Sequence, residues 1–303
     1  MAAGWRSVRV RWSRRVGARL AVLAALSALA ANLSTSPAAA DPTDPQGDTQ
    51  VWAGADISSN VWLVYSGVTV APWSRIYDEG FLFRAAGGYG GYTYSYTHAQ
   101  PEPDGGETLT PRSADARTYY GEVLVGYLKR FGELTAKAFI GASIVSHDIE
   151  LPEQTIAIGI GEEVGIKGAL ELWLNIGERG WASLDLSWST AHDTRAVRAR
   201  LGYRVWPKLS IGVEGGLHVD AQGECRVKGT SGGDCGHVIL SDDGGVTREP
   251  SRAELLDYAR GGGFVRYEWG VSELSVSAGV LRDTFGDKDD VAPYVTVNWL
   301  TQF

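Results

Sequence analysis

Lys208 to Asp220 read K-L-S-I-G-V-E-G-G-L-H-V-D, and apolar and polar residues alternate through this segment. The apolar residues occupy odd-numbered positions: Leu209, Ile211, Val213, Leu217 and Val219. The polar ones occupy even-numbered positions: Lys208, Ser210, Glu214, His218 and Asp220. Because successive side chains of a β-strand point to opposite faces, the segment predicts a strand with one apolar and one charged face.

The same alternation recurs along most of the chain. Further examples are Gly165–Ile176, Trp181–Trp188, Val197–Val205 and Ser272–Val280. Short turns are expected at Arg130–Glu133, Gly177–Gly180, Trp206–Lys208 and Trp269–Ser272. Longer breaks are expected at Thr97–Ala116, His147–Gln154, Ala191–Thr194, Ala221–Leu256 and Phe285–Asp290. Short and long connections therefore alternate between about twelve strands, which is typical of outer-membrane barrels. We predict an all-β protein, a single antiparallel transmembrane β-barrel over residues 50–303 with short periplasmic turns and longer outer loops.

Alternation alone fits a soluble barrel and a membrane barrel equally well, because the two differ only in which face points outward. Aromatic residues at strand ends favour the membrane barrel, in which they would form interfacial girdles. These residues are Trp52, Trp62, Trp73, Trp173, Trp181, Trp188, Trp206, Trp269 and Trp299. The closing segment Y-V-T-V-N-W-L-T-Q-F, Tyr294 to Phe303, places a terminal aromatic on an apolar face. It resembles the signal read by the barrel insertion machinery, so we expect Phe303 to be an assembly signal and outer-membrane lipid to surround the barrel.

The N-terminal region predicts export. Met1–Arg19 carries six Arg and no acid, and the apolar run Leu20–Ala31 follows. This run is shorter than the roughly 18 residues of a spanning helix, so a cleaved signal peptide over residues 1–40 is favoured over a membrane anchor. Asp41–Thr49 is polar and Pro-rich and is expected to be a disordered leader. The expected location is the outer membrane of a Gram-negative cell.

Charge and cysteine content limit the partners. Removing residues 1–40 changes the formal net charge from −8 to −14, because six Arg and no acid are lost. No basic patch remains, which excludes nucleic acid as a partner. Cys225 and Cys235 are the only cysteines, and export favours a disulfide between them. Free thiols or half of a metal site with His237 are the alternatives; no metal and no cofactor are expected.

Charged residues on the predicted inner face allow two interpretations. The set comprises Lys167, Glu171, Asp185, Arg198, Arg200, Arg204 and Glu214. In a structural network, Glu171 and Lys167 would meet Asp185, which would meet Arg198 or Arg200, and these would meet Glu214. In a polar passage, the three arginines would steer a solute through the lumen. Both remain open, since a buried charge needs only a partner or solvent.

No catalytic residues are predicted. The best local cluster is Ser189, His192 and Asp193, but there is no G-x-S-x-G motif. The Gly-rich segment Ala85–Tyr96 lacks the Lys-Ser/Thr of a phosphate loop. Where Tyr92, Tyr94 and Tyr96 reach the outer rim, they are candidates for stacking on a glycan. The alternative is that they belong to the interfacial aromatic girdle.

Several segments together resemble one family. They are A-G-A-D-I-S-S-N-V-W-L-V-Y-S-G-V-T-V-A-P-W (Ala53–Trp73), Asp78–Tyr94, Y-G-E-V-L-V-G-Y (Tyr120–Tyr127), G-I-K-G-A-L-E-L-W (Gly165–Trp173) and A-P-Y-V-T-V-N-W (Ala292–Trp299). They look like the BcsS-type cellulose biosynthesis proteins of Gram-negative bacteria. The resemblance implies an outer-membrane barrel that assists cellulose biosynthesis or export without being an enzyme, with cellulose or the synthase and export complex as partners. It supplies no catalytic residues. A general small-solute porin and an outer-membrane lipid hydrolase are the alternative functions.

Overall fold

A computed structural model describes residues 47–101, 107–149, 161–220, 237–240, 246–249, 256–283 and 290–303. All described residues belong to one compact unit, Pro42–Phe303. Within them, no helix has the length and apolar character needed to cross a bilayer.

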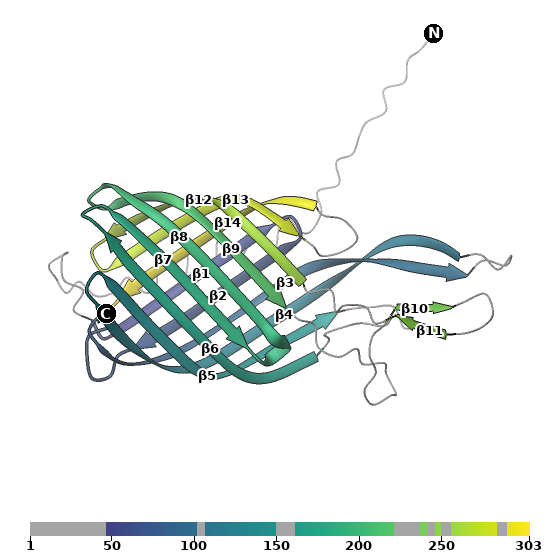
Figure 1. Cartoon of the computed structure of the whole chain (residues 1–303), viewed down its shortest axis with the longest axis horizontal. Coiled ribbons are helices and arrows are strands. Elements are labelled where there is room, and N and C mark those ends of the chain that lie inside the picture. Colours follow the sequence, from purple (N-terminus) through teal and green to yellow (C-terminus); the bar gives the residue numbers. More distant parts are fainter. Residues whose placement is uncertain are drawn as a thin grey trace, which may run out of the picture. The chain divides into compact units, whose positions relative to one another are not determined.

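Twelve of the described strands form one closed antiparallel barrel (Figure 1). They are β1 (Thr49–Ser58), β2 (Val61–Val70), β3 (Gly80–Pro101), β4 (Glu107–Phe131), β5 (Leu134–Ile149), β6 (Gly161–Ile176), β7 (Gly180–Ser189), β8 (Thr194–Trp206), β9 (Leu209–Asp220), β12 (Leu256–Trp269), β13 (Ser272–Asp283) and β14 (Asp290–Gln302). Each pairs with its neighbour along the chain, and β14 closes the barrel on β1. Two short strands, β10 (His237–Leu240) and β11 (Val246–Glu249), pair with each other. The predicted antiparallel barrel is confirmed.

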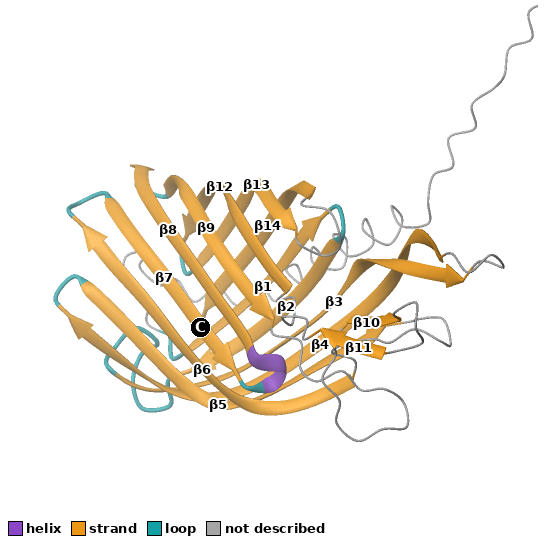
Figure 2. Cartoon of the chain, turned by 45° about the vertical axis from the view of Figure 1, so that its right-hand side comes forward, coloured by secondary structure: helices purple, strands orange, loops and turns teal. Residues whose placement is uncertain are grey.

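The two ends of the barrel differ in their connections (Figure 2). One end, here called the tight-turn end, carries the short turns β4–β5, β6–β7, β8–β9 and β12–β13 together with the start of β1 and the end of β14. The other, the loop end, carries the 3-10 turn η1 (Ala191–Asp193) and the breaks β5–β6, β9–β12 and β13–β14. The expected break Thr97–Ala116 is wrong, because β3 and β4 stay paired from Gly80↔Leu128 to Pro101↔Glu107.

The first strand pair reverses the alternation of short and long connections. β1 and β2 are joined at the loop end by the two residues Ser59 and Asn60, and the Ser58 hydroxyl accepts a hydrogen bond from Val61 N at 3.1 Å. β2 and β3 are joined at the tight-turn end by nine residues, 71–79, which we call the inner segment. The sequence analysis placed no break there.

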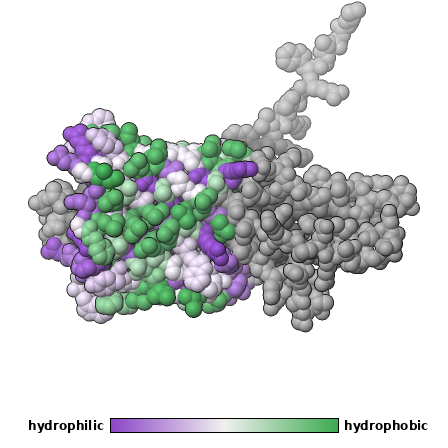
Figure 3. Space-filling model, viewed as in Figure 1, coloured by the Kyte–Doolittle hydropathy of each residue, from purple (hydrophilic) through white to green (hydrophobic). Residues whose placement is uncertain are grey.

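The apolar face of the strands points outward. Val123, Val164 and Val213, on β4, β6 and β9, are 68%, 69% and 60% exposed. By contrast, Leu124 on β4 and Glu214 on β9 are buried. Apolar residues cover the middle of the barrel wall in Figure 3, and polar residues gather at the tight-turn end. An apolar band between polar ends is what a lipid bilayer requires of a barrel wall.

Three tryptophans expected in the girdles instead face the lumen. Trp181 is 2% exposed, and its ring stacks on that of Trp173 with centroids 4.4 Å apart. Trp52 lies on the face of β1 that also carries Asp56, an ion-pair partner of Arg260. The prediction for these three is wrong because position near a strand end does not fix the face; the strand register does.

The inner segment folds into the tight-turn end of the lumen. Ile76 is fully buried and packs with Ala71, Leu82, Leu124, Leu128 and Phe139 in the hydrophobic core of the barrel. Backbone hydrogen bonds fix the segment: Ile76 N donates to Gly47 O at 3.0 Å and Ala71 N to Asp48 O at 2.7 Å. Residues 47–49, expected in a disordered leader, therefore take part in the barrel.

Tyr77 extends this packing across the lumen. Its hydroxyl accepts hydrogen bonds from the side-chain amides of Gln50, at 3.2 Å, and Gln302, at 2.8 Å. Burial, with the nearby Glu273 carboxylate, raises the pKa of Tyr77 to about 12, so the hydroxyl stays neutral at physiological pH. Lys137 lies over its ring, 5.3 Å from the centroid. The inner segment thus reaches from the β3–β5 wall to β1 and β14.

An aromatic cluster of Trp173, Trp181 and Phe264 lines the opposite wall. Trp181 contacts Phe264 at 5.4 Å between ring centroids, and the Arg266 guanidinium lies 4.9 Å from the Trp173 ring. Gly202 lets Trp181 lie flat on the wall, because a Cβ at Gly202 would be 2.3 Å from the indole. The tight-turn end of the lumen is therefore occupied by packed side chains from both walls.

Candidate functional site

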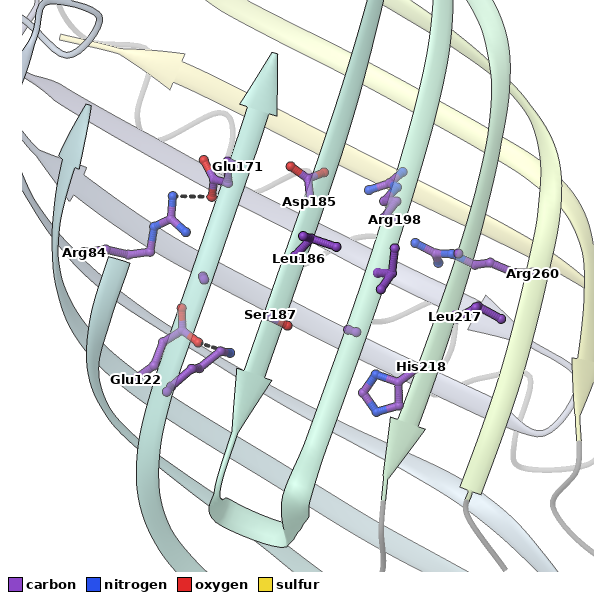
Figure 4. A pocket seen from close by; sticks show the side chains of 15 residues that line it. Arg84, Glu122, Glu171, Asp185, Leu186, Ser187, Arg198, Leu217, His218 and Arg260 are labelled. Carbon is purple, nitrogen blue, oxygen red and sulfur yellow. Dashed lines mark hydrogen bonds and ion pairs between the residues drawn. The ribbon is translucent and has the colours of Figure 1, made fainter. Parts of the chain in front are cut away.

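A polar cavity of about 190 Å³ lies in the middle of the lumen (Figure 4). Its charged lining comes from six strands: Arg84 of β3, Glu122 of β4, Lys167 and Glu171 of β6, Asp185 of β7, Arg198 of β8 and, from β12, Arg260. His218 of β9 lies towards the loop end. Lys167, Glu171, Asp185 and Arg198 were predicted members of the polar lumen set, and His218 was predicted on the polar face of its strand.

The cavity exists because a row of small residues crosses the wall. Ala169 pairs with Ser187, and Ser187 pairs with Ala196, on β6, β7 and β8. All three line the cavity. The adjacent row carries longer, charged side chains. In it, Asp185 is the cross-strand neighbour of Glu171 on one side and of Arg198 on the other. Side chains on the concave face of a barrel converge, so a row of small residues leaves a hollow that the longer neighbours surround.

Ion pairs in the lumen differ from the predicted chain of contacts. Glu171 forms an ion pair with Arg84 at 2.5 Å, and Lys167 forms one with Glu122; among the described residues, neither is hydrogen-bonded or ion-paired to Asp185. The observed partners are two or three strands away. The sequence analysis considered adjacent strands alone, whereas long side chains on the inside of a closed barrel reach across its curvature. The expected link from Asp185 to either arginine is not among the described ion pairs.

The Arg198–Glu214 pair is present at 2.6 Å and is part of a larger arrangement. The Glu214 carboxylate is fully buried and accepts further hydrogen bonds from Ser277 Oγ, at 3.0 Å, and Tyr294 Oη, at 2.9 Å. Three donors satisfy the carboxylate, which is the condition under which a buried charge is stable. Ser277 and Tyr294 were not predicted at this site, because their approach to Glu214 depends on the curvature of the wall across β9, β12, β13 and β14.

Arg198, Arg200 and Arg204 do not form a row of guanidinium groups open to a solute. Arg198 is engaged by Glu214, Arg200 lies 6.0 Å from the centroid of Phe264, and Arg204 is 4.0 Å from Glu268 at the tight-turn end. Each is therefore committed to a different partner. Partners of this kind are what the network interpretation expects; the passage interpretation stays a prediction.

Asp185 differs from the other acids of the lumen. It lies deep within the barrel, and the surface it retains borders the cavity. Among the described residues, none forms a hydrogen bond or an ion pair with its carboxylate, although Arg198 and Arg200 act on it at longer range. Asp185 is thus an acceptor that faces open space.

The candidate hydrolase cluster is not assembled as a relay. Ser189 Oγ lies 2.8 Å from Ser143 Oγ and accepts a hydrogen bond from Ala191 N. His192 Nδ1 is 3.4 Å from Glu163, and Asp193 pairs with Arg195 at 2.9 Å. Each of the three side chains contacts a residue other than the other two, and for Asp193 this residue is Arg195. Within the described part of the chain, no three His, Cys, Asp or Glu side chains are grouped to hold a metal ion.

The remaining candidate residues are placed as follows. Tyr92 is buried, and its hydroxyl lies 3.3 Å from His147 Nδ1, so it is not available for glycan stacking at the rim. The side chains of Tyr94 and Tyr96 lie outside the described part, and their glycan role stays a prediction. Cys225 and Cys235 also lie outside it. Phe303 is 54% exposed, and its backbone N donates to Thr49 O at 2.9 Å.

Comparisons with known proteins give one family. The model described as "Cellulose biosynthesis protein BcsS" matches residues 50–231. No curated protein matches the chain. Among solved structures, the COG4313 outer membrane channel from Pseudomonas putida F1 is 10% identical with a TM-score of 0.45, over 87% of this chain and 100% of that one. LpxR from Salmonella typhimurium is 10% identical with a TM-score of 0.45, over 84% and 100%. Likenesses this distant say nothing of what this chain binds or does.

Proposed function

Because the chain belongs to the family of cellulose biosynthesis protein BcsS, we propose that it is a non-enzymatic outer-membrane barrel that assists cellulose production without passing the polymer through its lumen. The single observation that carries the second half of the proposal is the occupied tight-turn end. Ile76 and Tyr77 of the inner segment reach across the lumen there, and Trp173 and Trp181 pack on the opposite wall.

The outer surface supports placement in the outer membrane. The exposed apolar residues on β4, β6 and β9 include Val123, Ile166 and Ile211, and exposed aromatic residues such as Trp73 and Trp206 lie near the tight-turn end. A soluble protein rarely exposes so large a continuous apolar surface. The tight-turn end would then face the periplasm and the loop end the exterior.

A closed lumen favours an accessory role beside a separate exporter. A glucan chain would need an open bore along the whole barrel, and a small-solute porin would need one as well. The charged side chains of the lumen are largely paired with one another, as Arg84 with Glu171 and Lys167 with Glu122. The porin alternative and the hydrolase alternative are therefore less well supported than an accessory barrel.

Deleting the gene should lower the amount of cellulose recovered at the cell surface several-fold and leave uptake of small solutes unchanged. Dye binding and the mass of acid-insoluble glucan measure the first, and uptake of a radiolabelled sugar measures the second. Complementation with the full chain should restore cellulose. Normal cellulose with altered solute uptake would instead favour the porin.

Phe303→Ala should reduce assembly of the barrel in the outer membrane several-fold. The substitution removes the exposed terminal ring while the backbone pairing with Thr49 can persist. Heat-modifiable mobility of the outer-membrane fraction measures the folded barrel. Phe131→Ala is the matched control, because Phe131 is an equally exposed aromatic, at 61%, at the same end of the barrel. Equal loss in both variants would contradict a specific assembly signal.

A further inference from the structure

We propose that the mid-lumen cavity is a binding site for one small neutral polyol, of the size of a single monosaccharide. The choice of glucose as the probe rests on the proposed function; the site itself is argued from its lining. A volume of about 190 Å³ holds several water molecules. It is smaller than the roughly 300–1,000 Å³ of sites for drug-sized ligands, so a longer oligosaccharide does not fit.

The charges around the cavity exclude an ion as the preferred occupant. Every cation of the lining already has an acidic partner: Arg84 has Glu171, Lys167 has Glu122, Arg198 has Glu214 and Arg260 has Asp56 at 3.4 Å. A free anion would compete with these carboxylates for the four bases, and a free cation drawn to Asp185 would still meet the four basic side chains close by. A neutral ligand does not disturb these ion pairs. It can also form hydrogen bonds with the N–H groups and carboxylate oxygens of the same side chains.

Asp185 supplies the specific acceptor. Its carboxylate borders the cavity and has no hydrogen-bond or ion-pair partner among the described residues. An enclosed carboxylate without donors is costly, so a ligand that brings hydroxyl donors to it is stabilised. Two neighbouring hydroxyls of a sugar ring can donate to the two carboxylate oxygens at once, as charge-assisted hydrogen bonds.

The row of small residues supplies the other face of the site. Ala169, Ser187 and Ala196 are cross-strand partners and lie beside the charged row that contains Asp185. Two methyl groups give an apolar strip for the C–H groups of a sugar ring, and the Ser187 hydroxyl can donate or accept. Sites for small ligands commonly combine such a strip with a few converging polar groups.

The route of entry follows from the closed end. The inner segment and the aromatic cluster occupy the tight-turn end, so a solute reaches the cavity from the loop end. His218 lies on that side of the cavity (Figure 4). In the proposed orientation the cavity therefore samples the cell exterior, where free sugars and the ends of secreted glucan chains are both present.

Titration of D-glucose into the purified full-length barrel in detergent tests the site by calorimetry and saturation-transfer NMR. Saturable binding is expected, with a dissociation constant on the order of millimolar for a ligand of this size. Ala196→Leu fills the hollow without changing a charge and should abolish binding. Asp185→Asn should weaken it at least about tenfold, through loss of charge-assisted hydrogen bonds. Ala199→Leu, at an exposed outward position of the same strand, should bind glucose like the original chain.

Three further probes complete the test. Cellobiose should bind no better than glucose, since one ring fills the cavity; much tighter binding would overturn a single-ring site. Methylammonium or inorganic phosphate binding more tightly than glucose would overturn a neutral ligand. The folded state of the barrel is checked by its heat-modifiable mobility. If folded barrel shows no saturable glucose binding, the cavity holds only water and the proposal is wrong. Failure here leaves the proposed function standing, because that is judged by the cellulose yield of the deletion strain.

Discussion

Replacing residues 72–78 with a Gly-Ser sequence of the same length should turn a barrel without openings into one with discrete openings in a planar bilayer. The replacement removes Ile76 and Tyr77 from the lumen and keeps the nine-residue span between β2 and β3. Without them, the hydrogen bonds from Gln50 and Gln302 are lost and the core residues Leu82 and Leu128 face a hollow. Water and ions can then enter from the tight-turn end.

Trp73→Ala is the matched control for this replacement. Trp73 belongs to the same segment, but it is 75% exposed and contacts Phe81 on the outer surface. It should leave the bilayer silent, like the original chain. Openings of equal size in the unaltered barrel would show that the inner segment does not close it. A folded replacement variant that stays silent would assign the closure to Trp173, Trp181 and Phe264 instead.

Arg198→Met should lower the free energy of unfolding by about 3–5 kcal/mol, the usual cost of removing one partner of a buried ion pair. Glu214 would keep its hydrogen bonds from Ser277 and Tyr294 but lose the only cation within 4 Å among the described residues. The double variant Arg198→Met with Glu214→Gln should recover much of this loss, because no uncompensated charge remains. Urea titration in lipid vesicles, followed by tryptophan fluorescence, measures all three.

Arg195→Met provides the control on the same strand. Arg195 pairs with Asp193 at 2.9 Å, but both side chains are about half exposed, 60% and 47%. An exposed pair contributes about 0–1 kcal/mol, so this variant should unfold almost like the original chain. If the double variant were less stable than Arg198→Met alone, the loss would come from packing rather than from the buried charge.

Under the proposed function, the inner segment at the tight-turn end would let a barrel of this family assist cellulose production without carrying the polymer. The loop end carries the ribbon of β3 and β4 beyond Tyr92 and Ala116, where neither strand pairs with another described strand. The candidate glycan residues Tyr94 and Tyr96 lie in this ribbon.

Much of the barrel wall could be read from local pattern. The alternation in Lys208–Asp220 fixed the two faces of β9, where Ile211 and Val213 are exposed and Ser210 is buried. The turns at Gly177–Gly180 and Trp269–Ser272 were recognisable because polar and glycine residues interrupt the alternation. The inner segment was missed because A-P-W-S-R-I-Y-D-E carries no periodic signal, although Pro72 and three charged residues could have marked a break.

By itself, the sequence determined that the chain builds an antiparallel barrel with an apolar outside and a charged inside, because side-chain direction in a strand depends only on a period of two residues. The tertiary structure alone decided what fills that inside. Arg84 meets Glu171 across three strands, Tyr77 reaches Gln302 from a distant connection, and Ala169, Ser187 and Ala196 fall into one row. These contacts depend on closure and register, which bring together residues far apart in the chain and which no local pattern encodes.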